Sequence, residues 1–270
     1  MKLGLSTYAY AWAIGVVGYP PNKPMDIPRF LHRANELEVK VVQIADNLPL
    51  HQLSSFALDQ LLNQAAKYGI QIEVGTRGIR PDHLRTYLKL AKHFDSPILR
   101  IVVDTSDHHP APEEIISTLR SLMPDFIDSG ITLAIENHDR FKVKTLVQII
   151  EAVDSLRLGI CLDTVNSFGA GEGPDVVVNA LGPYVINLHV KDYVIKRHHH
   201  MLGFEVVGTP AGQGQLNIPW LIETLDRNSH DFNAILELWP PLEPDLESTI
   251  RKEDEWVETS IDYLRTLIAE

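Results

Sequence analysis

The sequence predicts a single (β/α)8 barrel spanning residues 1–270, and two observations carry this prediction. Eight short apolar, β-branched runs alternate with stretches of helical periodicity along the chain. The runs start at intervals of 27–37 residues, apart from a gap of 49 before the last one. An open, doubly wound sheet is the competing arrangement, but it usually has a glycine-rich turn after its first strand. Residues 8–12 (YAYAW) follow the first run here and contain no glycine.

Each predicted element follows from its local pattern. The apolar runs predict buried strands at 3–8, 40–45, 70–74, 98–103, 131–136, 158–163, 185–190 and 234–239. The 3.6-residue periodicity predicts helices at about 26–38, 56–68, 81–94, 112–129, 143–155, 174–181, 218–228 and 247–268. Gly69 and Gly130 stand just before the next strand, where a glycine commonly ends a helix.

The long gap, residues 191–217, is predicted to be a loop over the exit of the seventh strand. It contains three consecutive histidines, His198–His200, and a glycine-rich run at 208–214. Glycine-rich loops before a helix can cradle phosphate, but a loop that merely turns sharply has the same composition. We therefore infer no phosphorylated substrate from this run.

Composition excludes several classes of protein. The 24 basic and 36 acidic residues give a formal charge of −12, which disfavours nucleic acid and anionic membrane surfaces as partners. No window reaches the ~18–20 apolar residues of a membrane span. Residues 1–18 imitate a short secretory signal, but polar side chains interrupt the apolar run and favour a buried strand. With its one cysteine, Cys161, the chain suits a reducing compartment, and we expect a cytoplasmic protein.

Four consecutive predicted strands end in ionisable side chains: Glu136, Asp163, His189 and Glu237. Active sites of such barrels lie at the carboxyl ends of the strands, so these side chains should converge. Three converging carboxylates repel one another unless a cation lies between them. Oxygen ligands with one imidazole suit a divalent ion, for which we favour Mn, with Mg, Co or Zn as alternatives.

Five further residues are candidates for binding substrate. Lys191 lies two residues beyond His189 and should face the same way, although an ion pair with a loop carboxylate such as Asp192 would also explain it. Four others also have structural explanations: Asn166 as a helix cap, Arg197 as a surface charge, His138 as part of an ion-pair layer inside the barrel, and Trp239 through core or rim packing. An ion-pair layer inside the barrel is the alternative to a place at the mouth for Asp46, Glu73 and Arg100.

The four strand-end residues, with the contexts LDTVNS and LHVKDY, resemble the xylose isomerase-like barrel superfamily over essentially the whole chain. Within it, the sequence is most similar to the sugar phosphate isomerase/epimerase group, which includes ketose 3-epimerases and inosose dehydratases. Ketose 3-epimerases have a histidine three residues after the strand-six aspartate, where this chain has Asn166. Lys191 occurs widely in the isomerase/epimerase and inosose dehydratase branch.

The resemblance implies a metal-dependent enzyme that moves a proton beside the carbonyl of a keto sugar or polyol through an enediolate. Glu136 and Glu237 would be the catalytic base and acid, while Asp163 and His189 would be ligands only. Elimination of water from an inosose or 3-keto sugar is the alternative reaction. An abasic-site endonuclease would need more His and Asp ligands, and a non-catalytic sugar-binding protein would not need both glutamates. The sequence leaves open whether the chain forms a homo-oligomer.

Overall fold

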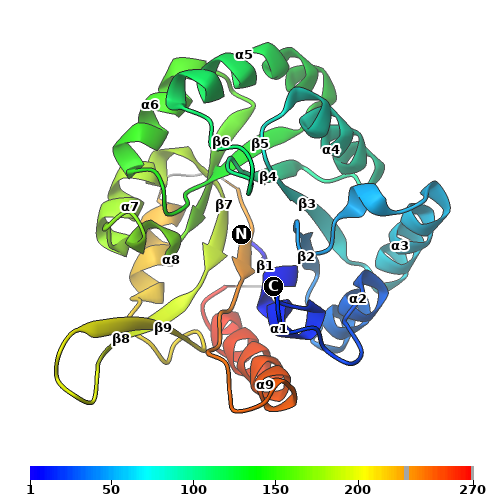
Figure 1. Ribbon diagram of the computed structural model, residues 1–270. Coiled ribbons are helices and arrows are strands. Elements are labelled where there is room, and N and C mark those ends of the chain that lie inside the picture. The colour runs from blue at the N-terminus through cyan, green and yellow to red at the C-terminus, as the bar shows by residue number, and fades with distance from the viewer. Residues whose placement is uncertain (228–230, 269–270) are drawn as a thin grey trace.

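The computed structural model describes residues 1–227 and 231–268 and has a closed barrel of eight parallel strands at its centre (Figure 1). The order around the barrel is β1-β10-β7-β6-β5-β4-β3-β2, so the first and last strands of the barrel pair and close it. The barrel strands are β1 (Leu3–Ser6), β2 (Val41–Ile44), β3 (Gln71–Arg77), β4 (Ile98–Val102), β5 (Thr132–Glu136), β6 (Leu158–Asp163), β7 (Val185–Val190) and β10 (Ala234–Leu236). This confirms the predicted single-domain (β/α)8 barrel.

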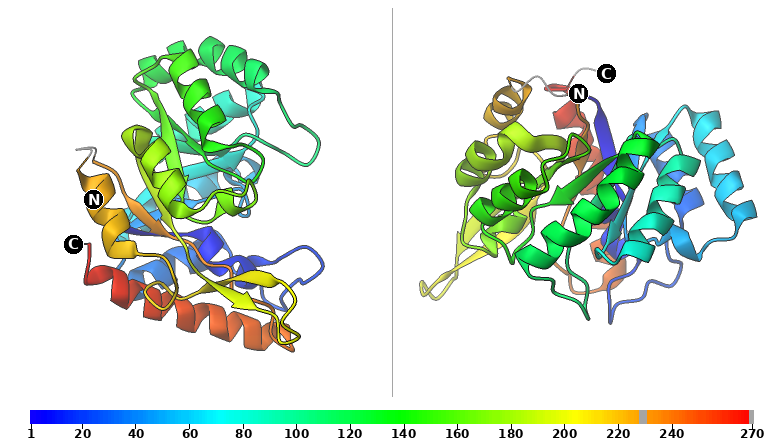
Figure 2. Two further views of the ribbon diagram at one scale, coloured as in Figure 1. Left: turned by 90° about the vertical axis from the view of Figure 1, so that its left-hand side faces the viewer. Right: turned by 90° about the horizontal axis from the view of Figure 1, so that it is seen from above.

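Helices cover the outside of the barrel between successive strands (Figures 1 and 2). They bury the apolar faces that the periodicity predicted, such as Leu84, Leu88 and Ala91 of the helix after β3. The helices are α1 (Ala11–Ile14), α2 (Ile27–Glu36), α3 (Ser55–Tyr68), α4 (Pro81–His93), α5 (Pro112–Ser129), α6 (Val143–Val153), α7 (Pro174–Leu181), α8 (Ile218–Asp226) and α9 (Leu246–Arg265). Gly69 and Gly130 end α3 and α5 with φ of 65° and 73°, as predicted.

Two predicted boundaries change near the ends of the chain. The last barrel strand has three residues and not six, so Glu237 lies immediately after β10. The first strand ends at Ser6 and not at residue 8, and the chain continues as a 3-10 turn η1 (Thr7–Tyr10) and the short helix α1. Residue 228, at the end of the helix predicted at 218–228, lies outside the described residues.

The prediction of a loop at 191–217 is wrong for most of that segment. The chain continues from β7 into an antiparallel hairpin of β8 (Asp192–Arg197) and β9 (Phe204–Thr209), which extends beyond the barrel (Figures 1 and 2). Both strands contain an adjacent β-branched pair, Val194–Ile195 in β8 and Val206–Val207 in β9, and an aromatic residue, all of which favour strands. The histidines and charged residues between and around these pairs make the segment polar overall, which is typical of a loop.

The glycine-rich run after β9 wraps around the carboxylate of Asp192. The backbone amides of Gly212 and Gly214 donate to Oδ2 of Asp192 at 2.9 Å each, and the amide of Leu216 donates to Oδ1 at 3.0 Å. A Cβ atom on Gly214 would lie 2.1 Å from Oδ1, so only glycine fits there. A carboxylate of the chain itself therefore occupies the position that an anion would need, which explains the glycines without a phosphate.

Within residues 1–227 and 231–268, no helix combines the length and the apolar character that a membrane crossing requires.

Candidate metal and active site

The barrel brings the four predicted ligands together at the carboxyl ends of adjacent strands. Glu136 and Asp163 are the last residues of β5 and β6, His189 is the fifth residue of β7, and Glu237 follows β10. The strand register pairs Asp163 with His189 and places Ile235 beside His189. All four side chains are buried, none with more than 2% of its surface exposed.

The four side chains face one another at distances that suit a shared ion. Nδ1 of His189 lies 3.3 Å from Oε2 of Glu136, 3.4 Å from Oε1 of Glu237 and 3.8 Å from Oδ2 of Asp163. Ligand atoms around one ion with bonds of about 2.0–2.2 Å are themselves about 3.0–3.5 Å apart. Within the described part of the chain, Nδ1 of His189 is buried and has no hydrogen-bond partner. The donor set and this unpartnered nitrogen therefore fit a divalent cation.

Lys191 lies against the same cluster. Its Nζ atom is 2.7 Å from Oδ2 of Asp163 and 2.7 Å from Oε2 of Glu237, and 13% of its side chain is exposed. The alternative ion pair with Asp192 does not form, because Asp192 accepts backbone amides of the glycine-rich loop. Lys191 is thus the cationic group that joins two of the proposed ligands.

These contacts control the charge of the two bridged carboxyl groups. Burial alone would raise the pKa of Asp163, but Lys191 and His189 hold it well below its usual value. Burial also opposes ionisation of Glu237, yet His189, Lys191 and Arg100 lower its pKa to about 2. Burial disfavours a charged Lys191, but Asp163 and Glu237 raise its pKa well above its usual value. Both carboxylates and the ammonium are therefore charged at neutral pH.

Arg100 forms a second ion pair on the other side of the cluster. Its Nε donates to Oε2 of Glu136, and its Nη1 donates to Oδ1 of Asp46 at 3.2 Å. Oδ2 of Asp46 accepts from the hydroxyl of Tyr8 at 3.0 Å and from Nε of Arg77 at 3.3 Å. Arg100 therefore forms ion pairs with Asp46 and with Glu136, as the prediction of an ion-pair layer stated.

Two neutral donors complete the contacts of the glutamates. Nδ2 of Asn166 donates to Oε1 of Glu136 at 2.7 Å, and Oγ of Ser6 donates to Oε1 of Glu237 at 2.8 Å. With Arg100 on Glu136 and Lys191 on Glu237, every oxygen of the two glutamates has a donor or a cation beside it. Asn166 does not cap the following turn; Asp163 does so by accepting the backbone amide of Asn166 at 2.9 Å.

The structure does not bring the other three predicted substrate-binding residues to the cluster. The guanidinium of Arg197 packs over the ring of Phe204 on the projecting hairpin and donates to the carbonyl of Met201. Nε1 of Trp239 donates to the carbonyl of Asp192 at 3.4 Å, at the base of the hairpin. His138 pairs with Asp139 beside it in the sequence. Substrate binding by these three residues stays a prediction.

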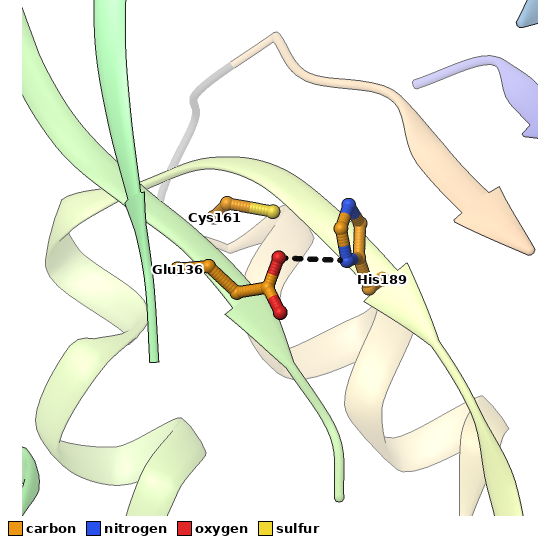
Figure 3. A group of neighbouring side chains, drawn as sticks. All are labelled: Glu136, Cys161 and His189. Atoms are coloured by element: carbon orange, nitrogen blue, oxygen red, sulfur yellow. Dashed lines mark ion pairs between the residues drawn. The ribbon is translucent and has the colours of Figure 1, made fainter. Parts of the chain in front are cut away.

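A layer of hydrogen-bonded polar side chains under the cluster was not predicted. Nε2 of His189 hydrogen-bonds to Oε1 of Gln43 at 2.7 Å, and Cys161 lies next to Glu136 and His189 (Figure 3). Glu73 belongs to this layer and not to an ion pair, since it accepts hydrogen bonds from the amides of Gln43, Asn187 and Asn233. A polar residue at an inward position of an apolar strand, such as the glutamine of VVQI, is the sequence signal for this layer.

Comparison with known proteins identifies the family of this chain. The family model described as "Xylose isomerase-like TIM barrel" matches residues 31–267. The chain belongs to the xylose isomerase-like TIM barrel family. It is also 35% identical, over 98% of its length and 96% of the relative, to 3-oxo-isoapionate decarboxylase from Pectobacterium atrosepticum.

Solved structures of the family share the fold at low sequence identity. D-psicose 3-epimerase from Clostridium cellulolyticum H10 is 16% identical with a TM-score of 0.73, and 99% of each chain is covered. A xylose isomerase-like TIM barrel protein from Mycobacterium smegmatis, solved in complex with magnesium, is 15% identical with a TM-score of 0.70 over 97% of each chain. These similarities show the shared fold, while the case for a divalent metal in this chain rests on its own buried cluster.

We expect metal binding to stabilise the protein measurably. At a Mn²⁺ concentration about 100-fold above Kd, binding contributes ~2.7 kcal/mol, which for a barrel of this size raises Tm by about 5–10 °C. Asp163→Asn should lose most of that rise, because it removes one of the three carboxylates around His189. Asp104→Asn is the matched control, since Asp104 pairs with Arg140 outside the cluster. Thermal melts with and without EDTA measure the effect, and equal rises in both variants would exclude this ligand set.

Proposed function

We propose that the protein is a divalent-metal-dependent decarboxylase of a 3-oxo acid derived from a sugar. The identity with a 3-oxo-isoapionate decarboxylase over nearly the whole chain supports this reaction class. We favour decarboxylation over isomerisation because of the contacts that the oxygens of Glu136 and Glu237 make. Each of the four oxygens of the two glutamates already has a hydrogen-bond donor or a cation beside it, which leaves neither glutamate a free basic oxygen. The ammonium of Lys191 lies against the same cluster and can donate a proton. A decarboxylase needs an acid at the carbon that loses CO2, and it needs no base to start.

The proposed reaction follows from the chemistry of a 3-oxo acid. The bond between C1 and C2 breaks, and the carboxylate carbon C1 leaves as CO2. The electron pair of that bond forms a double bond between C2 and C3, and the keto oxygen on C3 becomes an enolate oxygen. A proton then adds to C2 and restores the keto group. A divalent cation held by Glu136, Asp163, His189 and Glu237 would act as a Lewis acid that stabilises negative charge on the substrate's oxygens.

The side chains around that position have separate roles in this proposal. Lys191 holds Asp163 and Glu237 in place and donates the proton to C2 from its Nζ atom. Arg100 and Asn166 fix the carboxylate of Glu136, one on each oxygen. Ser6 fixes Glu237 from the neighbouring strand. These contacts orient the ligands before substrate arrives, which reduces reorganisation during the reaction.

Sugar isomerisation or epimerisation is the second candidate function. Glu136 and Glu237 approach Nδ1 of His189 from β5 and from the end of β10, at 3.3 and 3.4 Å. Carboxylates on two sides of one position are the arrangement that proton removal and return on opposite faces of a substrate would need. In this candidate the two glutamates are the catalytic base and acid.

We expect the metal-loaded protein to release CO2 from 3-oxo sugar acids. In deuterated water, each turnover should place one deuterium on the product carbon that carried the carboxyl group. A CO2 assay combined with NMR of the product measures both. Exchange of a carbon-bound proton in ketoses without any release of CO2 from the acids would instead establish the isomerase.

Lys191→Met should reduce CO2 release by about 10²–10⁴-fold, the usual cost of losing an acid–base group. Metal affinity should be retained or rise, because the variant removes a positive charge beside two ligands. Lys196→Met, on the exposed part of the hairpin, is the control and should keep the wild-type rate. Turnover and metal affinity of both variants, the latter by calorimetric titration, test whether Lys191 takes part in catalysis. An unchanged rate in Lys191→Met would show that Lys191 is not the proton donor.

The variants Glu136→Gln and Glu237→Gln separate the two candidate reactions. If neither glutamate acts as a base, CO2 release at saturating metal should fall less than about tenfold, whereas loss of a general base costs about 10²–10⁴-fold. Rates must be compared at measured metal occupancy, because weak binding alone lowers turnover. Loss of proton exchange between ketoses and solvent in a fully loaded variant would assign that glutamate to proton transfer and favour the isomerase.

A further inference from the structure

The polar layer below the cluster contains a hydrogen bond with a defined direction. Oε1 of Gln43 lies 2.7 Å from Nε2 of His189, and both side chains are fully buried. An imidazole nitrogen can donate to an amide oxygen only when it carries a hydrogen. If the amide orientation of Gln43 is fixed, the position of the proton on His189 is therefore fixed as well.

The neighbours of Gln43 do fix that orientation. Its Nε2 atom lies 3.1 Å from Oε2 of Glu73 and 3.0 Å from Oδ1 of Asn187, and it donates to both. Nδ2 of Asn187 donates to the same Oε2 of Glu73 at 3.0 Å, which sets the orientation of the Asn187 amide. Nδ2 of Asn233 holds the other oxygen of Glu73 at 2.7 Å. Rotating the amide of Gln43 by 180° would place its oxygen against two acceptors.

We propose that Gln43, oriented by Glu73 and Asn187, is a positioning residue that holds His189 with the hydrogen on Nε2. The lone pair of Nδ1 then faces Glu136, Asp163 and Glu237, which is the tautomer that a metal ligand requires. Outer contacts of this kind fix ring orientation and raise the basicity of a ligating imidazole. The inference rests on a metal-binding cluster and is independent of which reaction the enzyme catalyses.

The tautomer can be observed directly in the wild-type protein. We expect long-range ¹H–¹⁵N NMR of the Zn²⁺-loaded, ¹⁵N-histidine-labelled protein to report a protonated Nε2 and a non-protonated Nδ1 for His189. The His189→Gln spectrum identifies its signals. A hydrogen on Nδ1 in the zinc-loaded protein would overturn the proposal.

Variants test the effect on metal binding. Gln43→Met removes the acceptor at similar volume and should weaken Mn²⁺ binding by about 10–100-fold in calorimetric titration. Thr76→Val is the matched control, because Thr76 is buried on β3 and hydrogen-bonds to His83, away from the cluster. It should bind Mn²⁺ as the wild type does.

A charge-swapped pair keeps the proposal testable if Gln43→Met fails to fold. In the double variant Gln43→Glu with Glu73→Gln, a carboxylate oxygen again faces Nε2 of His189, and affinity within about threefold of wild type is expected. Wild-type affinity in a folded Gln43→Met, or loss of binding in a folded double variant, would overturn the proposal. So would a wild-type protein that binds no metal. A protein that binds metal as described but releases no CO2 would reject the proposed reaction and leave this inference standing.

Discussion

Three carboxylates buried around one imidazole nitrogen are the constraint on which the rest of the site depends. Removing charges from water costs several kcal/mol for each ion, and close pairing must compensate for that cost. Lys191 and Arg100 supply compensating charge from two sides, and Ser6 and Asn166 supply neutral donors. The nitrogen of His189 nevertheless keeps three oxygens within 3.8 Å and no hydrogen-bond partner among the described residues. A cation at that point satisfies all four ligands together.

Because side chains alternate along the barrel strands, the inward-pointing polar side chains around His189 form two layers. Asn187 and Cys161 each lie two residues before a ligand, so their side chains point inward one level below His189 and Asp163. One residue beyond Lys191, Asp192 leaves the barrel and binds the loop amides of Gly212 and Gly214. The acid proposed for the reaction therefore stands between a rigid strand and a tightly held loop. Both neighbours limit how far its backbone can move.

The barrel and the convergence of four ionisable side chains could be predicted because each depends on local pattern and on one topological rule. Periodicity defined the strands, and the rule that parallel strands present their carboxyl ends together placed Glu136, Asp163, His189 and Glu237 side by side. Contacts between distant segments could not be predicted in this way. The pairing of Arg100 with Asp46 and Glu136 depends on how far the side chains reach across the barrel. Gln43 carries no charge, so its residue type alone does not predict the hydrogen bond to His189. The contact of Arg197 with Phe204 likewise depends on the pairing of β8 with β9, which the loop prediction for 191–217 did not contain.

One constellation on this fold can serve several reactions, because all of them pass through an enolate that the same cation stabilises. What distinguishes the reactions is the supply of protons. An isomerase must remove a proton from carbon, so it needs a carboxylate with a free and basic oxygen. In this chain, donors or cations lie beside both oxygens of each glutamate, and the charges around Glu237 lower its pKa to about 2. A reaction that begins by losing CO2 generates its own carbanion and needs only a proton donor afterwards. An ammonium group held against the ligands, as Lys191 is, matches that requirement better than a carboxylate already engaged with other groups.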